Sequence, residues 1–291
     1  MAETAGQRLA TSLGEGVCTV LAYGSCVRDS DPTEGLLDLY VIVSGYEAVY
    51  GHGWLSRTNR LLPPNVFYRA LALEQATVRI KFAIISLDDF ERGIARAALP
   101  YLWGRFAQPV RLVVNRDERA RERVIESLAV AVERLLSATH PLMAGAFTAD
   151  ALWERGLRLS YATELRPEPG ERAQALVARD ADHYRRLTAA AAERVGLVAE
   201  AGGSRYRSPA GRRAYWSTRL AWTGRRWGGR AATLVRLVKA SLTFQGGVDY
   251  AVWKVERHTG MSIPVTPRLR RHPLIFGWPL LWRLLRHRLL R

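Results

Sequence analysis

Two short apolar segments, separated by a glycine-serine turn and a polar loop, constrain the fold of this chain more than any other feature. The first covers residues 17–23 and leads into Gly24-Ser25, and the second covers residues 36–43. Both are rich in Val, Leu and Tyr and have the length of buried strands. Asp38 stands thirteen residues after Ser25, near the start of the second segment. The pattern therefore predicts a first strand that is followed by a tight turn, and a second strand with a carboxylate near its start.

The turn and the carboxylate together are typical of nucleotidyltransferase sites. Gly24 has no Cβ, so the backbone can approach a triphosphate closely. The Ser25 hydroxyl and nearby backbone N–H groups can hold phosphate oxygens. Asp38 can hold a divalent metal ion that neutralises phosphate charge. The structural alternatives are an ordinary tight turn at Gly24-Ser25 and, for Asp38, a strand-end cap or an ion pair with one of the many arginines.

One position departs from this pattern. Most such sites carry two carboxylates in alternation on the second strand, so that both face the same side of the sheet. Here Tyr40 occupies the second position. Either the chain has lost catalysis, or the second metal ligand comes from another part of the sequence.

The charge of the chain indicates an anionic partner. Its 291 residues carry a net charge of +16, and the hydrophobic content of 48% is enough for a folded core. Nucleic acid, anionic lipid and nucleotide all remain candidate partners. Only three of the 43 basic residues are lysines, namely Lys81, Lys239 and Lys254. Because lysine is a compact point charge that arginine does not replace well at a phosphate, each is a candidate for chemistry.

The remaining pattern predicts an α+β fold. Strands are expected near 66–68, at 77–85 and at 109–114, with a helix from Leu87 to about Ala98 that is capped by Ser86. Helices are expected at 117–138, 148–163, 171–197, 212–245 with an interruption at Gly228-Gly229, and 247–258. We therefore expect a mixed β-sheet domain of nucleotidyltransferase type at 1–115, a helical domain at 116–230, and basic C-terminal helices at 231–291.

The last eighteen residues, 274–291, alternate bulky apolar side chains with arginine. This segment is too short and too basic to span a bilayer. It has the composition of a helix that lies in a lipid interface, with Trp at headgroup depth and Arg against anionic lipid. The alternative is a C-terminal helix that docks on the core and exposes its arginines to solvent.

Five blocks of the sequence, in this order, resemble a known family. They are Ala22-Tyr23-Gly24-Ser25 with Asp38, and residues 78–86, 104–110, 159–166 and 239–247. The family is that of the mitochondrial-type phosphatidate cytidylyltransferases, also called the translocator assembly and maintenance family, which has bacterial members. Its second strand commonly carries a single Asp, so Tyr40 resembles the family state. Two positions depart from the family: Cys26 replaces a frequent Gly, and Glu164 replaces the usual Asp.

The resemblance implies a reaction in which CTP and phosphatidate give CDP-diacylglycerol and pyrophosphate, with Mg²⁺ as cofactor. A phosphate monoester is largely ionised at neutral pH, so the attack on CTP requires no strong general base. Catalysis would then depend on alignment and charge neutralisation. This fits a set of sequence blocks that contains no histidine.

Within this resemblance, Asp38 is expected to be catalytic as a Mg²⁺ ligand, and Gly24 and Ser25 are expected to hold the CTP phosphates. Lys81 stands in an apolar strand, where an unpaired charge is expensive, and is expected to be catalytic by holding phosphate or pyrophosphate. The alternative for Lys81 is a buried partner for a carboxylate. Arg105 is expected to neutralise the leaving group, or else to form a structural ion pair.

Three further residues complete the expected site. Glu164 is the candidate second metal-binding carboxylate, and the alternative is an ion pair with Arg166 or another neighbour. Lys239 and Ser241 are expected to meet the phosphatidate headgroup or CTP, and the alternative is a solvated basic face. The cytosine contacts and the oligomeric state are not predicted by the sequence.

The absence of a mitochondrial presequence favours a bacterial cytoplasmic protein that attaches peripherally to the inner face of the cell membrane. No nucleic-acid partner is expected on this interpretation. Two other hypotheses remain open: a nucleotidyltransferase with a soluble or RNA acceptor, and a non-catalytic protein that binds anionic lipid through a decayed site.

Overall fold

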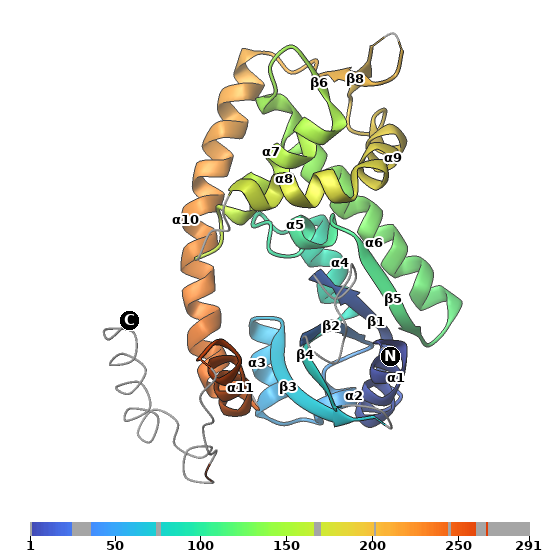
Figure 1. Ribbon diagram of the computed structural model, residues 1–291, viewed down its shortest axis with the longest axis vertical. Helices are drawn as coiled ribbons and strands as arrows, with labels where there is room; N and C mark the ends of the chain where they lie inside the picture. Colours follow the sequence, from blue (N-terminus) through green and yellow to red (C-terminus); the bar gives the residue numbers. More distant parts are fainter. Residues whose placement is uncertain are drawn as a thin grey trace.

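The computed structural model describes residues 2–24, 36–73, 77–165, 170–200, 202–243, 246–259 and residue 266. A β-sheet domain lies at one end of the molecule and a mainly helical region at the other (Figure 1). One long helix runs along the side and connects the two ends. The Ser25 position and residues 274–291 lie outside the described residues, so the predictions for the turn serine and for the tail stay predictions.

The sheet contains five strands, and all five lie where the sequence predicts strands. They are β1 (Val17–Tyr23), β2 (Leu36–Val43), β3 (Asn65–Ala72), β4 (Thr77–Ser86) and β5 (Val110–Asn115). Their order is β3-β4-β2-β1-β5. Strands β2 and β4 pair in parallel and the other neighbours pair antiparallel, so the sheet is mixed. The α+β class and the mixed sheet are therefore confirmed.

The two faces of the sheet have different roles, because successive side chains of a strand point to opposite sides. Leu37 and Leu39 of β2 pack in the core beneath the first helix, α1 (Ala2–Leu13). Tyr40 and Ile42 face the other way, toward α4 (Leu87–Ala95), α5 (Trp103–Phe106) and α6 (Glu118–Ser137). Asp38 belongs by alternation to this second face.

Tyr40, the residue at the expected second carboxylate position, is a core residue. Its side chain is fully buried. Its ring packs edge-to-face against Tyr23 at 5.5 Å and against Phe106 at 4.9 Å between ring centroids. Aromatic pairs in this geometry stabilise a core beyond their buried area. The position therefore serves packing, and a second metal ligand would have to come from elsewhere.

Side-chain caps set the start of several helices. Ser86 accepts a hydrogen bond from the backbone N–H of Asp89 and begins α4, as the sequence predicts, although α4 ends at Ala95 and not near Ala98. Asp117 caps α6 in the same way, and Thr148 caps α7 (Ala149–Tyr161). Such caps satisfy backbone donors that have no partner inside the helix.

Several short elements are not predicted by the sequence pattern, namely α2 (Glu47–Tyr50), α3 (Trp54–Leu61) and η2 (His140–Leu142). The helix expected at 148–163 is present as α7 (Ala149–Tyr161), and α8 (Gly170–Arg179) and α9 (Ala181–Ala191) follow it. A small antiparallel sheet has the order β6-β8-β7, formed by β6 (Ala146–Thr148), β7 (Val198–Ala199) and β8 (Arg205–Arg207).

The prediction of a single helix over 171–197 is wrong. The chain breaks at Asp180, so that α8 and α9 both pack against α7. The indole N–H of Trp153 donates a hydrogen bond to Thr188, and its ring packs on Tyr184 at 4.6 Å between centroids. Tertiary packing on Trp153 therefore favours the break, although no glycine or proline marks it in the sequence.

The predicted interruption at Gly228-Gly229 is also wrong. Helix α10 (Arg212–Thr243) runs through both residues, and α11 (Gly247–Thr259) follows it. A Cβ at Gly229 would lie 2.6 Å from the carbonyl oxygen of Thr163. The glycine thus permits close packing between two segments and does not end the helix. The domain boundary expected at residue 230 falls inside α10. Among the described helices, none is long and apolar enough to cross a membrane.

Candidate active site

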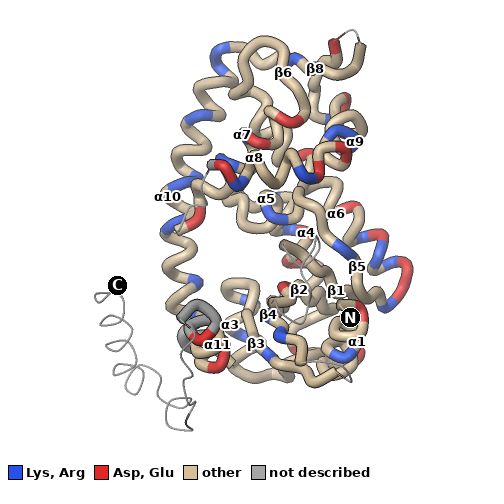
Figure 2. The backbone as a smooth tube through the Cα atoms, viewed as in Figure 1, with Lys and Arg blue, Asp and Glu red and all other residues tan. Residues whose placement is uncertain are grey.

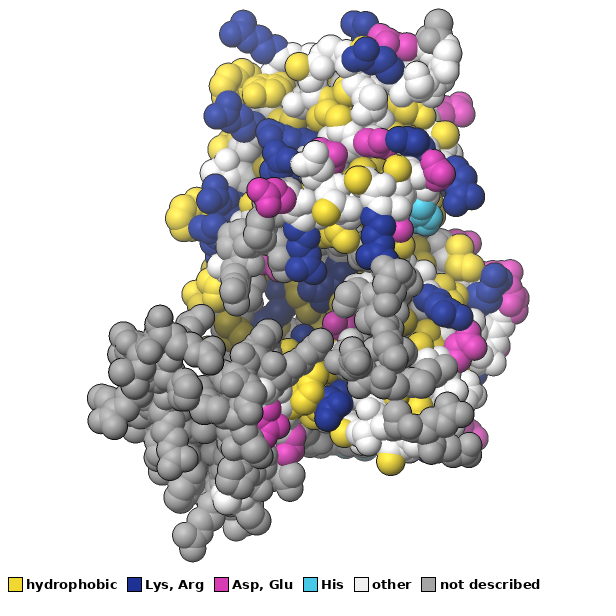
Figure 3. All heavy atoms as spheres, in the orientation of Figure 1, with side chains coloured by type: hydrophobic (Ala, Val, Ile, Leu, Met, Phe, Trp, Pro, Cys, Tyr) yellow, Lys and Arg dark blue, Asp and Glu magenta, His cyan; other side chains and the backbone are white. Residues whose placement is uncertain are grey.

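The predicted catalytic pair lies on neighbouring parallel strands. Asp38 of β2 and Lys81 of β4 are register partners and therefore belong to the same face of the sheet. Both line a pocket of about 260 Å³ at the junction of the sheet and the helical region. We call this the polar pocket, lined by Tyr23, Gly24, Asp38, Lys81, Arg105, Gln108, Pro109, Tyr161, Glu164, Arg172 and Leu176. Figure 3 shows Lys and Arg side chains gathered in the hollow at the middle of the molecule.

The structure brings five of the predicted site residues into this one pocket. Gly24, Asp38, Lys81, Arg105 and Glu164 come from positions spread over 140 residues of sequence. Ser25 lies outside the described residues, and the side chain of Ser241 is not described. Lys239 lines a neighbouring pocket.

Two opposing effects act on the pKa of the Asp38 carboxyl. Burial raises its pKa, and the nearby charges of Lys81 and Arg105 act in the opposite direction. Gly24 has a φ of +77°, in the left-handed region that favours glycine. A Cβ on Gly24 would come within 3.9 Å of Asp38 Oδ2. The turn backbone therefore lies directly beside the carboxylate, as the sequence pattern predicts for a triphosphate site.

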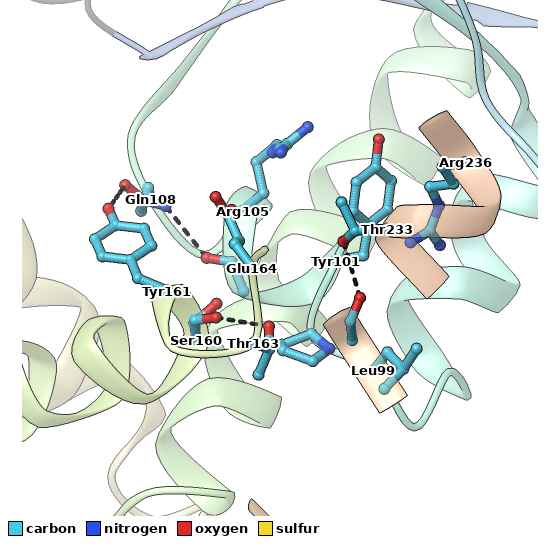
Figure 4. A pocket seen from close by; sticks show the side chains of 13 residues that line it. Leu99, Tyr101, Arg105, Gln108, Ser160, Tyr161, Thr163, Glu164, Thr233 and Arg236 are labelled. Atoms are coloured by element: carbon cyan, nitrogen blue, oxygen red, sulfur yellow. Dashed lines mark hydrogen bonds between the residues drawn. The ribbon is translucent and has the colours of Figure 1, made fainter. Parts of the chain in front are cut away.

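Arg105 extends from α5 between aromatic rings. Its guanidinium carbon lies 5.5 Å from the centroid of the Tyr23 ring and 4.9 Å from that of Tyr101. Burial opposes its charge, but the surrounding tyrosines and Glu164 favour it, and its pKa is raised overall. Figure 4 shows Tyr101 between Arg105 and Arg236 of α10. Cation–π contacts thus fix a permanent positive charge over the pocket.

Close packing at Gly104 positions both Arg105 and Glu164. A Cβ at Gly104 would lie 2.2 Å from Ser160 Oγ, so only glycine lets α5 approach the end of α7 this closely. The Tyr161 hydroxyl donates a hydrogen bond of 2.9 Å to Gln108 Oε1, which strengthens the same contact (Figure 4). Glu164, in the turn after α7, consequently lines the same pocket as Asp38 although the two are far apart in sequence.

The carboxylates of the polar pocket suit a magnesium ion that also binds the phosphates of a nucleotide. Asp38 and Glu164 are the carboxylates among the pocket residues. In the part of the chain that the structure describes, no group of three or more His, Cys, Asp or Glu side chains could hold a metal on its own. Mg²⁺ commonly binds through one or two carboxylates together with substrate phosphates and water. The residues present therefore fit Mg²⁺ in company with a nucleotide.

Lys239 has a structural task that the sequence does not reveal. Its ammonium donates hydrogen bonds to the carbonyl oxygens of Leu62 and Pro64, the latter at 2.7 Å. Burial, with a contribution from Arg236, lowers the pKa of Lys239 to about 8. The residue ties α10 to the loop before β3. The expected contact with a headgroup or with CTP stays a prediction.

A second pocket of about 300 Å³ adjoins the polar pocket along α10. We call it the apolar pocket, lined by Tyr23, Pro64, Val66, Lys81, Phe82, Ala83, Tyr101, Arg105, Thr233, Arg236, Leu237, Lys239, Ala240 and Thr243. The two pockets share Tyr23, Lys81 and Arg105. Sequence reasoning missed Arg236 and Tyr101. Arg236 is one of many arginines in a basic helix, and no local motif distinguishes it.

Comparison with known protein families identifies the family of this chain. The family model described as mitochondrial phosphatidate cytidylyltransferase matches residues 40–208, more than half of the chain. The match includes Lys81, Arg105 and Glu164, whereas Gly24 and Asp38 precede it. Among curated proteins, none shows significant sequence similarity to the chain.

One solved structure that resembles the chain is that of a nucleotidyltransferase-like protein from Exiguobacterium sibiricum 255-15. It is 13% identical, with a TM-score of 0.30, over 95% of this chain and 89% of that chain. A likeness this distant carries no weight for the fold or the activity. The family match is sufficient by its extent: the chain belongs to the mitochondrial phosphatidate cytidylyltransferase family and is a nucleotidyltransferase.

Proposed function

We propose that the protein is a phosphatidate cytidylyltransferase that converts CTP and phosphatidate to CDP-diacylglycerol and pyrophosphate in phospholipid biosynthesis, with Mg²⁺ as cofactor. The family match supports the reaction class. The observation that carries the proposal is the placement of Gly24, Asp38, Lys81 and Arg105 around one pocket. A turn, a carboxylate and two cations are the groups that a nucleoside triphosphate and its metal ion require.

The reaction is a displacement at phosphorus. An oxygen of the phosphatidate monoester attacks the α-phosphorus of CTP and forms a new P–O bond. The bond from the α-phosphorus to the oxygen that bridges to the β-phosphorus breaks, and pyrophosphate leaves with that oxygen. The monoester is already ionised, so no side chain has to remove a proton. The described lining of the site accordingly consists mainly of charged and polar groups and backbone, and contains no histidine.

Each residue has a role that follows from its place. The Gly24 backbone would approach the triphosphate, and Asp38 would hold Mg²⁺, with Glu164 as the candidate second carboxylate. The bound ion would neutralise phosphate charge and orient the triphosphate. Lys81 and Arg105 would stabilise the negative charge that develops on the leaving pyrophosphate. Because both cations are held by the fold, this stabilisation requires little reorganisation.

The exposed face of α10 supports peripheral attachment to a membrane. Trp216, Leu220, Trp227, Leu234 and Val238 are each more than half exposed and follow one another at helical spacing. All charged residues of α10 are basic, and Figure 2 shows them distributed along the helix. The Arg219 and Arg230 guanidiniums lie over the rings of Trp216 and Trp227. Trp and Leu flanked by Arg are suited to the interface of an anionic bilayer.

The central test combines substrate and nucleotide specificity. Purified protein is mixed with vesicles that contain phosphatidate, with Mg²⁺, and with each of the four nucleoside triphosphates in turn, and both pyrophosphate and liponucleotide are measured. Liponucleotide from CTP, lost in Asp38→Ala, is the expected result. Pyrophosphate release that requires a soluble or RNA acceptor would favour another nucleotidyltransferase. Tight vesicle binding without product would leave a lipid-binding protein that has lost catalysis.

A separate test addresses the proposed location at the inner face of the bacterial cell membrane. Vesicle flotation is compared for the full chain, for a chain that lacks residues 274–291, and for Trp227→Glu. We expect binding to anionic vesicles to weaken in one or both variants and to be lost at high salt. Undiminished binding of both variants would contradict a role for these two segments. Neutral vesicles provide the control for charge dependence.

A further inference from the structure

The apolar pocket has the composition of a site for an anion with an apolar body. Val66, Phe82 and Leu237 provide apolar walls, and Lys81, Arg105 and Arg236 provide cations. None of its described lining residues is acidic. A pocket for water or for a neutral metabolite would not need this concentration of positive charge, whereas a phosphate attached to a hydrocarbon group matches both parts of the lining.

Arg236 and Lys239 are the cations that line this pocket and not the polar pocket, and of the two Arg236 is the one suited to an anion. Its guanidinium carbon lies 3.9 Å from the centroid of the Tyr101 ring. Its Nε is buried without a hydrogen-bond partner among the described residues. Lys239, the neighbouring cation on α10, instead donates to the carbonyls of Leu62 and Pro64. A buried donor without a partner calls for an explanation, and a bound anion provides one.

The shared residues fix how the two pockets are related. Tyr23, Lys81 and Arg105 line both, so that ligands in the two pockets would meet beside Lys81 and Arg105. The polar pocket contains the carboxylates and the Gly24 turn, which suit a metal-bound triphosphate. The apolar pocket lies along α10, and its described lining includes no carboxylate. A nucleotide in the polar pocket and the phosphate that accepts its cytidylyl group in the apolar pocket would therefore approach each other at Lys81 and Arg105.

We propose that the apolar pocket is the acceptor site, which binds the phosphate monoester and glycerol of phosphatidate with Arg236 in contact with the monoester. This assignment rests on the proposed function. The apolar pocket has a volume of about 300 Å³, at the lower end of the range of small-molecule sites, ~300–1,000 Å³. The pocket therefore takes the headgroup region, while most of each acyl chain stays outside.

The test uses the full-length protein and dihexanoyl phosphatidate, a short-chain lipid that needs no vesicle. Binding is measured by calorimetry, with glycerol 3-phosphate and dihexanoyl phosphatidylcholine as probes for the headgroup alone and for the lipid without a monoester. We expect dihexanoyl phosphatidate to bind more tightly than either probe. Arg236→Gln should weaken its binding by about tenfold or more, the loss expected for a charge-assisted hydrogen bond. The affinity for CTP should not change.

A second variant reduces the volume of the apolar pocket without removing a charge. Ala240→Phe should fill part of the apolar pocket, which Ala240 lines, and raise the KM for phosphatidate while leaving the KM for CTP unchanged. The matched controls on the same helix are Arg226→Gln and Ala231→Phe, at exposed positions outside both pockets. Both controls should bind dihexanoyl phosphatidate like the parent protein. Thermal melting and CTP binding establish that each variant is folded.

The outcomes separate this inference from the proposed function. If the parent protein makes liponucleotide while Arg236→Gln and Ala240→Phe keep its KM for phosphatidate, the acceptor site lies elsewhere and the function stands. If the parent protein binds CTP but neither binds nor uses phosphatidate, the proposed function fails and the inference with it. If glycerol 3-phosphate binds as tightly as dihexanoyl phosphatidate, the pocket recognises a soluble phosphomonoester and the lipid assignment is overturned.

Discussion

Asp38 and Lys81 lie directly opposite each other on the parallel strands β2 and β4, on the face of the sheet that adjoins the helical region. Burial raises the pKa of Asp38, and the positive charge of Lys81 acts against this rise. On the proposed function, Asp38 would hold the metal ion and Lys81 would hold phosphate beside it. A parallel register thus converts two separate sequence motifs into one site.

Replacing Asp38 by Asn should abolish most of the activity with little change of shape. The side chain keeps its size but loses the charge that would hold Mg²⁺. We expect the rate of liponucleotide formation to fall by about 10²-fold or more, because a bound metal contributes several kcal/mol to charge stabilisation. Steady-state kinetics over a range of Mg²⁺ concentrations measures this. A variant with near-parent activity at ordinary Mg²⁺ would remove Asp38 from the metal site.

Replacing Arg105 by Lys tests whether its geometry matters beyond its charge. Lysine keeps the charge but cannot stack its planar group on Tyr23 and Tyr101 as arginine does. We expect kcat to fall by roughly tenfold, the effect of losing about 1.4 kcal/mol of transition-state stabilisation. The control is Arg111→Lys at an exposed pair with Glu3. Equal kinetics of both variants and the parent protein would show that the stacking has no catalytic role.

Substituting two glycines of α10 by alanine should have opposite effects. Gly229→Ala forces a Cβ against the carbonyl of Thr163, and we expect a loss of about 1–3 kcal/mol in the free energy of unfolding. Gly224→Ala meets no neighbouring atom and should stabilise the helix by up to about 1 kcal/mol. Chemical denaturation of the two variants measures both effects. Stabilisation by both substitutions would refute close packing at Gly229.

The contribution of Lys239 to stability should depend on pH. Its pKa in the folded protein is about 8, below the ordinary value of 10.5. Between these two values the unfolded chain binds more protons than the folded chain, so the free energy of unfolding rises with pH. We expect the parent protein to gain stability relative to Lys239→Met between pH 7.5 and 9.5. Denaturation at both pH values checks this, and a stability difference that does not change with pH would contradict it.

Local features of the sequence were enough to predict the sheet strands and part of the site. Alternating or continuous apolar residues identify β1, β2 and β4, because buried strands require them. The glycine turn and Asp38 are recognisable because both belong to one short segment whose chemistry is specific. Lys81 could be singled out because a lone lysine in an apolar strand needs a reason to be there.

Other parts of the site could not be predicted from local pattern. Arg236 and Tyr101 stand more than 130 residues apart and meet only because α10 crosses the molecule beside α5. The bonds of Lys239 to the carbonyls of Leu62 and Pro64 likewise depend on how α10 is placed. Glu164 was a candidate from the resemblance, but its place in the same pocket as Asp38 depends on the packing of Gly104 against Ser160.

The sequence by itself determined which segments form the sheet, where a glycine turn follows the first strand, and which carboxylate lies near the start of the second strand. Only the tertiary structure decided that Gly229 serves packing rather than a break, that Tyr40 belongs to the core, and that two pockets share Lys81 and Arg105. The physical reason is that periodicity and turn chemistry act between neighbours in the chain. Close approach, burial and the sharing of charge act between residues that only folding brings together.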